Sequence, residues 1–152
     1  MVIRAAGIAD LVQVYDLLNA LRLESIWATI PIEPSQPYVH VQLLNILHDA
    51  SRRMVVADRN GEIVGVCHGA IAEHEYLPGL TYVIERDFYV LPRYRHLGIG
   101  KQLWNDVLQW GKAHGAYGGF YGRIKVQSIH RCVEEIIWTV FDHQPAEVIC
   151  QE

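Results

Sequence analysis

The chain has 152 residues and a mass of 17.3 kDa, a length that suits one domain covering residues 1–152. Apolar residues make up 51% and charged residues 20%, a balance that excludes an intrinsically disordered chain. The net charge is −4 and the pI is about 6.0, so a nucleic-acid-binding surface over the whole protein is not expected.

The cysteines and the length of the apolar runs indicate where in the cell the protein is expected to be. The three cysteines, Cys67, Cys132 and Cys150, lack CxxC spacing, which predicts reduced thiols and a cytoplasmic protein. They form no zinc-binding pattern with the histidines, so no metal is predicted. No stretch approaches the ~18 consecutive apolar residues of a membrane span, and the first residues do not resemble a signal peptide. No contact with a membrane is therefore expected.

The first part of the chain predicts one strand and two helices. Residues 2–5 form a short apolar strand. Asp10 fits a helix N-cap, because apolar residues recur after it at spacings of three and four, at Leu11, Val14, Leu18 and Leu21. Three prolines make residues 26–37 an irregular loop, and a second helix is predicted over residues 38–51.

A hairpin and a long strand follow these helices. Strands are predicted over residues 53–57 and 62–71, joined by Asn60-Gly61, because both of these residues tolerate positive φ. Residues 81–90 form a long strand that carries three charges in succession, Glu85, Arg86 and Asp87. Charges inside an otherwise apolar strand predict that one of its faces borders a wet cleft.

The last third of the chain predicts two further helices and two strands. Helical spacing of Ile129, Val133, Ile136 and Val140 indicates the second of these helices. The order β-α-α-β-β-β-α-β-α-β describes a mixed α/β sheet flanked by helices. Its final elements are a turn at 92–97, a helix from Gly98 to Gly111 or Gly115, a strand at 116–124, a helix at 127–141 and a strand at 146–150.

Residues 88–104 place a strand end, a basic turn and a helix start in direct succession. The first-turn N–H groups of a helix lack intrahelical acceptors, and the helix dipole adds positive potential there. Gly98 and Gly100 leave room for a ligand to approach the backbone. The pattern predicts a phosphate site, with a glycine-containing loop before a core helix as the alternative. Three cations add positive charge: Arg93, Arg95 and Lys101.

The run Arg95-His-Leu-Gly98-Ile-Gly100 resembles R/Q-x-x-G-x-G/A, the acyl-CoA signature of the GNAT superfamily of N-acyltransferases. The element order is also similar from residue 1 to about residue 124. The resemblance implies a mostly antiparallel central sheet flanked by helices, with acetyl-CoA as co-substrate. It also implies main-chain contacts with acetyl-CoA from Tyr89 and Val90 at the pantetheine, and from Arg95, His96, Leu97, Gly98, Ile99, Gly100 and Lys101 at the pyrophosphate.

The activity that this resemblance implies is transfer of an acetyl group to a primary amine of a small molecule or a protein. Direct attack of the amine on the thioester is expected, because no cysteine has a matching base partner in the motif. A CoA-binding or protein-interaction module that has lost catalysis is the alternative. Modification of nucleic-acid bases by a fold relative is disfavoured by the net negative charge.

Acetyl transfer to an amine requires a base, since only about one lysine-like amine in a thousand is neutral at pH 7. Glu85 and Asp87 are the predicted catalytic residues, because they share one strand face and family members often carry a glutamate at or near Glu85. Cross-strand salt bridges are the alternative, and Glu85 is also a candidate to bind a cationic acceptor. His68 and His74 are candidate proton relays or structural histidines. Trp27 is a candidate substrate-binding residue or a packed loop anchor.

The sequence departs from the family pattern near its C-terminus. Many members protonate the departing thiolate with a tyrosine on the last helix, and that position falls near Trp138, which is expected to be a core aromatic with Phe141. Tyr117 and Tyr121 are possible substitutes, so the acid is left open. The usual closing hairpin is expected to be shortened or missing, and an uncovered edge strand would favour a homodimer.

Overall fold

The computed structural model of the protein describes residues 1–128 and 131–141. The strands of this part of the chain form a single sheet in the order β1-β2-β3-β4-β5-β6. They are β1 (Val2–Ala5), β2 (Arg52–Arg59), β3 (Glu62–His74), β4 (Leu77–Val90), β5 (Gly118–Ser128) and β6 (Arg131–Val140). The helices are α1 (Leu11–Glu24), α2 (Gln36–His48) and α3 (Ile99–Ala113), with 3-10 turns η1 (Ile8–Asp10), η2 (Ile26–Thr29) and η3 (Pro92–Tyr94).

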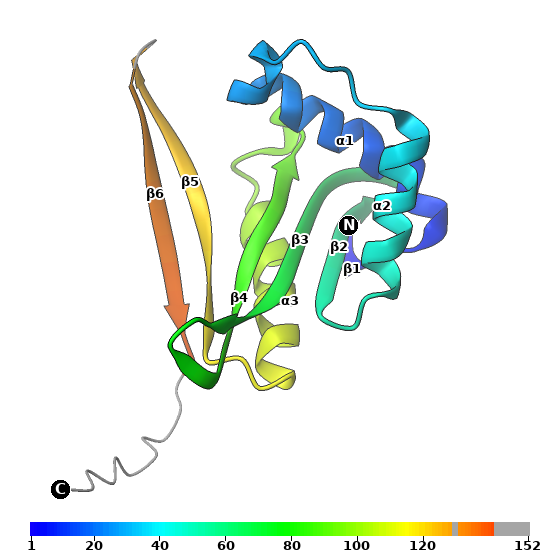
Figure 1. Ribbon diagram of the computed structural model, residues 1–152. Helices are drawn as coiled ribbons and strands as arrows, with labels where there is room; N and C mark the ends of the chain where they lie inside the picture. The colour runs from blue at the N-terminus through cyan, green and yellow to red at the C-terminus, as the bar shows by residue number, and fades with distance from the viewer. Residues whose placement is uncertain (129–130, 142–152) are drawn as a thin grey trace, which may run out of the picture.

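Neighbouring strands of the sheet are antiparallel except β4 and β5, which run parallel. Helix α3 connects these two strands and covers one face of the sheet, whereas α1 and α2 cover the other face (Figure 1). The predicted mixed, mostly antiparallel sheet flanked by helices is confirmed. No helix within the described residues has the length and apolar character needed to cross a bilayer.

Two apolar layers hold the helices against the sheet. The layer beneath α3 includes Leu103 and Val107, and the layer beneath α1 and α2 includes Val14 and Leu43. Burying each such side chain contributes about 1.5–3 kcal/mol. Val83 is buried in the α3 layer, and a Cβ added to Gly69 on β3 or to Gly119 on β5 would lie 3.1 Å from it. The glycines therefore allow close packing around β4.

The predicted Asn60-Gly61 turn is confirmed, whereas helix α2 starts before and ends before its predicted bounds. Asn60 and Gly61 have φ values of 55° and 91°, which close the β2–β3 hairpin as expected. Helix α2 begins two residues earlier than predicted, at Gln36, with Ser35 as its N-cap. The reason is that Pro37 fits the first turn of a helix, where its missing N–H needs no partner.

Asp10 precedes α1 as predicted, but its side chain does not cap that helix. Its carboxylate accepts the Gly7 N–H at 2.7 Å and two guanidinium nitrogens of Arg4 at 2.7 and 2.8 Å. Arg4 also donates to Asp58 at 3.1 and 2.8 Å, beside the β2–β3 turn. These hydrogen bonds tie β1 to the start of α1 and to the hairpin. The Arg4 hydrogen bond is the main cause that holds the pKa of Asp10 below its ordinary value.

We expect Asp10→Asn to lower the free energy of unfolding at pH 7 by about 1–3 kcal/mol, because the neutral amide loses the charge-assisted bonds to Arg4. Folding lowers the pKa of Asp10, so its contribution is complete above the unfolded value of 3.8 and is lost as the pH falls through the folded value. Urea unfolding should therefore show the deficit shrinking below about pH 4. Asp16→Asn, on the exposed side of α1, is the control. A deficit unchanged in acid would contradict the prediction.

Residues 131–140 form strand β6, so the predicted helix over 127–141 is wrong. The strand pairs antiparallel with β5 in a register that runs from Gly118↔Val140 to Ser128↔Arg131. The apolar residues of the segment fit a helix by spacing, but many of them are β-branched and favour a strand. Pairing with the long strand β5 decides between a helix and a strand for this segment.

This strand changes the environment of the C-terminal aromatic residues. Trp138 is 60% exposed and packs against Phe120 with ring centroids 4.3 Å apart, so its expected place in the core is wrong. Phe141 is buried as predicted. The candidate strand over 146–150, and with it the predicted shortening or loss of the closing hairpin, lies outside the described residues.

Candidate active site

A β-bulge interrupts β4 at Arg86. His68 of β3 lies opposite Asp87, whereas the next residue of β3, Gly69, lies opposite Glu85. Arg86 is therefore the extra residue of the bulge. An extra residue breaks the alternation of side chains between the two faces of a strand and bends it. Glu85 and Asp87 nevertheless line the same cavity.

This bulge cavity has a volume of about 330 Å³ and lies on the side of the sheet that α2 covers. It contains two arginines, two carboxylates and an imidazole. The His68 Nδ1 atom lies 2.9 Å from Asp87 Oδ2, and the His68 side chain is only 3% exposed. Within the described part of the chain, no cluster of His, Cys, Asp and Glu side chains is arranged to hold a metal ion. The cavity is lined by Ile46, Arg52, His68, Glu85, Arg86 and Asp87.

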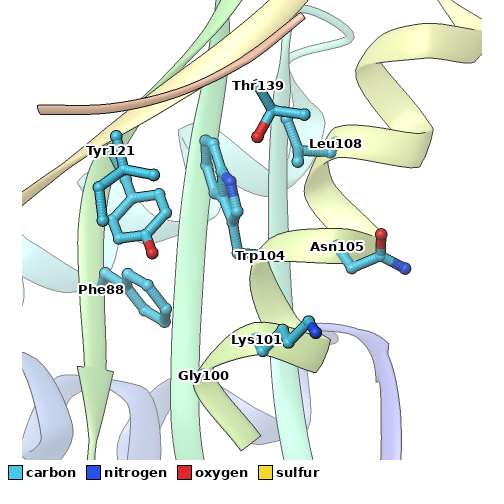
Figure 2. A pocket seen from close by; sticks show the side chains of 9 residues that line it. Phe88, Gly100, Lys101, Trp104, Asn105, Leu108, Tyr121 and Thr139 are labelled. Atoms are coloured by element: carbon cyan, nitrogen blue, oxygen red, sulfur yellow. The ribbon is translucent and has the colours of Figure 1, made fainter. Parts of the chain in front are cut away.

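The sheet opens between β4 and β5. Among the described residues these strands are paired at Val83↔Gly119 and Ile84↔Phe120, and beyond these pairs they diverge (Figure 1). A second cavity, the α3 cavity, lies between the diverging strands and α3 and has a volume of about 520 Å³. Figure 2 shows Trp104 between Tyr121 and Leu108 in this cavity. The lining consists of Phe88, Gly100, Lys101, Trp104, Asn105, Leu108, Tyr121, Ile137 and Thr139.

The α3 cavity reaches the first turn of α3. Gly98 is the N-cap residue and has a φ of 76°, in the left-handed region that favours glycine. The Gln102 N–H donates to the Gly98 carbonyl at 3.2 Å, so the amides of residues 99–101 are the first-turn donors without an intrahelical acceptor. A Cβ on Gly100 would lie 3.3 Å from the Phe88 ring, so this glycine lets the turn approach β4. The geometry suits an anion.

The three cations near this turn differ in their availability. Arg95 donates to Glu24 at 2.8 Å, and Arg93 forms an ion pair with Glu62. Lys101 makes no ion pair with any residue that the structure describes. The prediction that all three add positive charge therefore needs correction, because acidic partners distant in the sequence neutralise both arginines.

The two strand residues predicted to bind pantetheine have partners of their own. The buried Tyr89 side chain points to α1, and its hydroxyl donates to Glu24 at 2.5 Å. Burial is the main cause that raises the pKa of Tyr89, and the Tyr89 hydrogen bond is the main cause that lowers the pKa of Glu24. The Val90 carbonyl accepts from Arg95 Nε at 2.9 Å. Three residues of the following loop are exposed: His96, Leu97 and Gly98.

The remaining candidates do not all reach these cavities. Trp27 lies in η2, is 62% exposed, and lines neither the α3 cavity nor the bulge cavity. His74 and Tyr117 line a third cavity of about 310 Å³ near Trp138. Tyr121 is the tyrosine that lines the α3 cavity.

Sequence reasoning missed Trp104. Its Nε1–H is buried and has no hydrogen-bond partner among the described residues. A buried donor without a partner requires an explanation, because such groups are normally satisfied by protein or solvent. The sequence feature that could have pointed to Trp104 is its position four residues after Gly100, which places both residues on one side of α3.

Comparisons with known proteins agree with this geometry. The model of the Acetyltransferase (GNAT) family matches residues 14–125. A search of curated proteins finds no match. Similar solved structures include the ribosomal-protein-alanine N-acetyltransferase of Brucella melitensis, with a TM-score of 0.69 and 17% identity over 93% of this chain and 100% of that chain. Another is glucosamine-6-phosphate N-acetyltransferase of Arabidopsis thaliana, with a TM-score of 0.65 and 18% identity over 83% of each chain.

An aminoglycoside acetyltransferase from an uncultured soil metagenomic sample, in complex with sisomicin, has a TM-score of 0.65 and 20% identity over 84% of this chain and 80% of that chain. At these identities the solved structures show a shared fold. The family model covers well over half of the chain, and it includes the bulged strand and the glycine-rich helix start. The chain therefore belongs to the GNAT acetyltransferase family.

Proposed function

We propose that the protein transfers an acetyl group from acetyl-CoA to a primary amine, which attacks the thioester directly. The observation that carries this proposal is the pair of cavities on the two sides of β4. Phe88 lines the α3 cavity and the adjacent Asp87 lines the bulge cavity. A donor in the first cavity and an amine in the second would meet at the edge of β4 that has separated from β5.

The residues of the α3 cavity fit a CoA molecule. The open amides of residues 99–101, the helix dipole and Lys101 together favour its diphosphate. The Trp104 Nε1–H can donate to an amide carbonyl of the pantetheine arm. The cavity volume of about 520 Å³ lies within the usual range for small-molecule sites.

The bulge cavity supports an amine acceptor. Glu85 and Asp87 carry negative charges that attract a protonated amine, and the amine must lose a proton before it attacks. In the reaction the C–N bond forms, the C–S bond breaks, and CoA leaves as a thiolate. We assign stabilisation of the transient oxyanion to main-chain amides at the open edge of β4. Similar structures named for an aminoglycoside and for a ribosomal-protein alanine support small-molecule and protein amines alike.

Two further residues bear on the route of the reaction. Burial is the main cause that raises the pKa of Cys67 well above its ordinary value, and a buried neutral thiol is a poor nucleophile. This supports direct attack of the amine rather than transfer through an acylated cysteine. Tyr121 lines the α3 cavity, which supports its phenol as the group that protonates the thiolate.

The test combines binding with turnover. Calorimetry should detect saturable binding of CoA and acetyl-CoA, and a panel of primary amines should include acceptors that cause release of free thiol with equal formation of acetylated product. Binding without turnover on any amine would instead support the catalytically inactive CoA-binding module. Absence of binding at millimolar ligand would overturn both functions.

We expect Trp104→Phe to weaken the binding of CoA by about 2- to 10-fold, because it removes one hydrogen-bond donor and keeps an aromatic ring in the cavity. Calorimetry measures the change in Kd. Trp110→Phe is the matched control, since Trp110 is on the same helix but does not line the cavity. Equal affinities of Trp104→Phe and wild type would show that this indole N–H makes no bond to the ligand.

A further inference from the structure

We propose that His68, oriented by Asp87, is the group that accepts the proton from the attacking amine. The proposal rests on the acetyl transfer proposed above and assigns separate roles to the acidic residues of the bulge cavity. Asp87 is a positioning residue that acts on the imidazole, and Glu85 binds the cationic acceptor. His68 is then a catalytic residue contributed by β3 rather than by the bulged strand.

The bulge in β4 aligns the two members of this dyad. His68 and Asp87 are direct partners in the β3–β4 register, and the register shifts immediately after them. The His68 Nδ1 to Asp87 Oδ2 distance is 2.9 Å. The His68 side chain is 3% exposed and that of Asp87 is 34% exposed, so the carboxylate is wetter than the imidazole it contacts. An ordinary surface salt bridge would not bury the imidazole in this way.

The hydrogen bond decides which imidazole nitrogen can act as the base. An ionised carboxylate only accepts hydrogen bonds, so Nδ1 must carry the proton that points to Asp87. The neutral ring then has its lone pair on Nε2. Nε2 is buried and has no hydrogen-bond partner within the described residues. His68 therefore carries a buried lone pair, without a partner among the described residues, on a ring that Asp87 holds in place.

The other charged groups around the imidazole suit this division of roles. Glu85, Arg86 and Asp87 come from β4, and Arg52 comes from the start of β2. Asp49, just after α2, is close enough for its charge to interact with His68. From α2 itself the cavity receives only the apolar Ile46 among the residues described. The acidic groups stabilise the imidazolium that forms when Nε2 takes a proton, while the two arginines oppose it.

The cationic amine first gives one proton to His68 Nε2, and the neutral nitrogen then forms a bond to the thioester carbon. The C–S bond breaks and CoA departs as a thiolate. The nitrogen loses a second proton as the amide forms, which balances the proton that the thiolate receives from Tyr121. The proton on Nε2 is afterwards lost to solvent, which regenerates the neutral ring.

His68→Asn is the main test, because the asparagine amide can keep an N–H donor near Asp87 but cannot accept the proton. We expect kcat/KM to fall by roughly 10²- to 10⁴-fold, with the Kd for CoA unchanged. In wild type kcat/KM should fall as the pH is lowered and Nε2 becomes protonated, and His68→Asn should lose this acidic limb. His74→Asn, farther along β3, is the matched control and should retain both the rate and the pH profile.

Two further measurements distinguish a catalytic His68–Asp87 pair from a purely structural one. Nitrogen-15 NMR of the wild-type protein should show His68 protonated at Nδ1 and not at Nε2 near neutral pH, with the signal assigned by its loss in His68→Asn. Asp87→Asn should lower kcat and shift the ring toward the other tautomer. Protonation at Nε2, or a His68→Asn enzyme with the wild-type pH profile and rate, would overturn the dyad. Absence of turnover by wild type on every amine would instead overturn the proposed function.

Discussion

Replacing Gly98 by aspartate is expected to weaken the binding of CoA by about 100-fold. Two unit charges about 4 Å apart near a protein surface interact by about 4 kcal/mol, and salt reduces this repulsion between the new carboxylate and the diphosphate. A Cβ at Gly98 would meet nothing within 4 Å, so the cost of the change to the fold is the backbone strain of a non-glycine residue at a φ of 76°. Aspartate is also a favoured N-cap residue and is among the few residues that adopt positive φ.

Gly98→Asn separates charge from shape in this experiment. Asparagine has nearly the same size and also accepts a positive φ, so its effect on the Kd for CoA should be only a few-fold. Calorimetry at low and high salt should show the difference between the two variants narrowing as salt increases. Equal affinities of the aspartate and asparagine variants would place the diphosphate away from this helix start.

Glu85→Gln is expected to reduce kcat/KM for cationic amines by about 100-fold, mainly through KM, while the Kd for CoA stays unchanged. Glutamine keeps the size of the side chain but removes the charge that faces the bulge cavity. Steady-state kinetics with varied amine and saturating acetyl-CoA measures the two parameters separately.

The controls for Glu85→Gln use the acceptor as well as the enzyme. Glu75→Gln removes an exposed acid beyond β3 and should leave the kinetics unchanged. A weakly basic amine, which is uncharged at neutral pH, should lose much less than a cationic amine with Glu85→Gln. Equal losses with both kinds of amine would show that Glu85 does not act by binding positive charge.

Short-range features of the fold could be predicted because they depend on a few neighbouring residues. The Asn60-Gly61 turn and the glycine-rich start of α3 follow from the backbone freedom of those residues. Strand β6 could not be predicted in the same way. Its apolar residues fit two periodicities, and pairing with β5 decides the outcome.

In the candidate site, too, features set by neighbouring residues could be predicted, whereas features set by residues distant in the sequence could not. Glu85 and Asp87 could be predicted as neighbours, but the bulge at Arg86 depends on the register with β3. The signature drew attention to Arg95, yet its guanidinium is engaged by Glu24, which lies 71 residues earlier in the chain. Trp104 has the helical spacing of a core residue, and its role at the α3 cavity emerges only where β4 and β5 separate.

The separation of β4 from β5 affects which sizes of ligand the opening between them can accept. Within the described part of the chain two residue pairs join these strands, so the width of the opening beyond them depends on side chains rather than on a hydrogen-bonded ladder. Trp104 and Leu108 of α3 line the cavity on that side. Substitutions of Trp104 and Leu108 are therefore expected to change the width of the α3 cavity without changing the backbone.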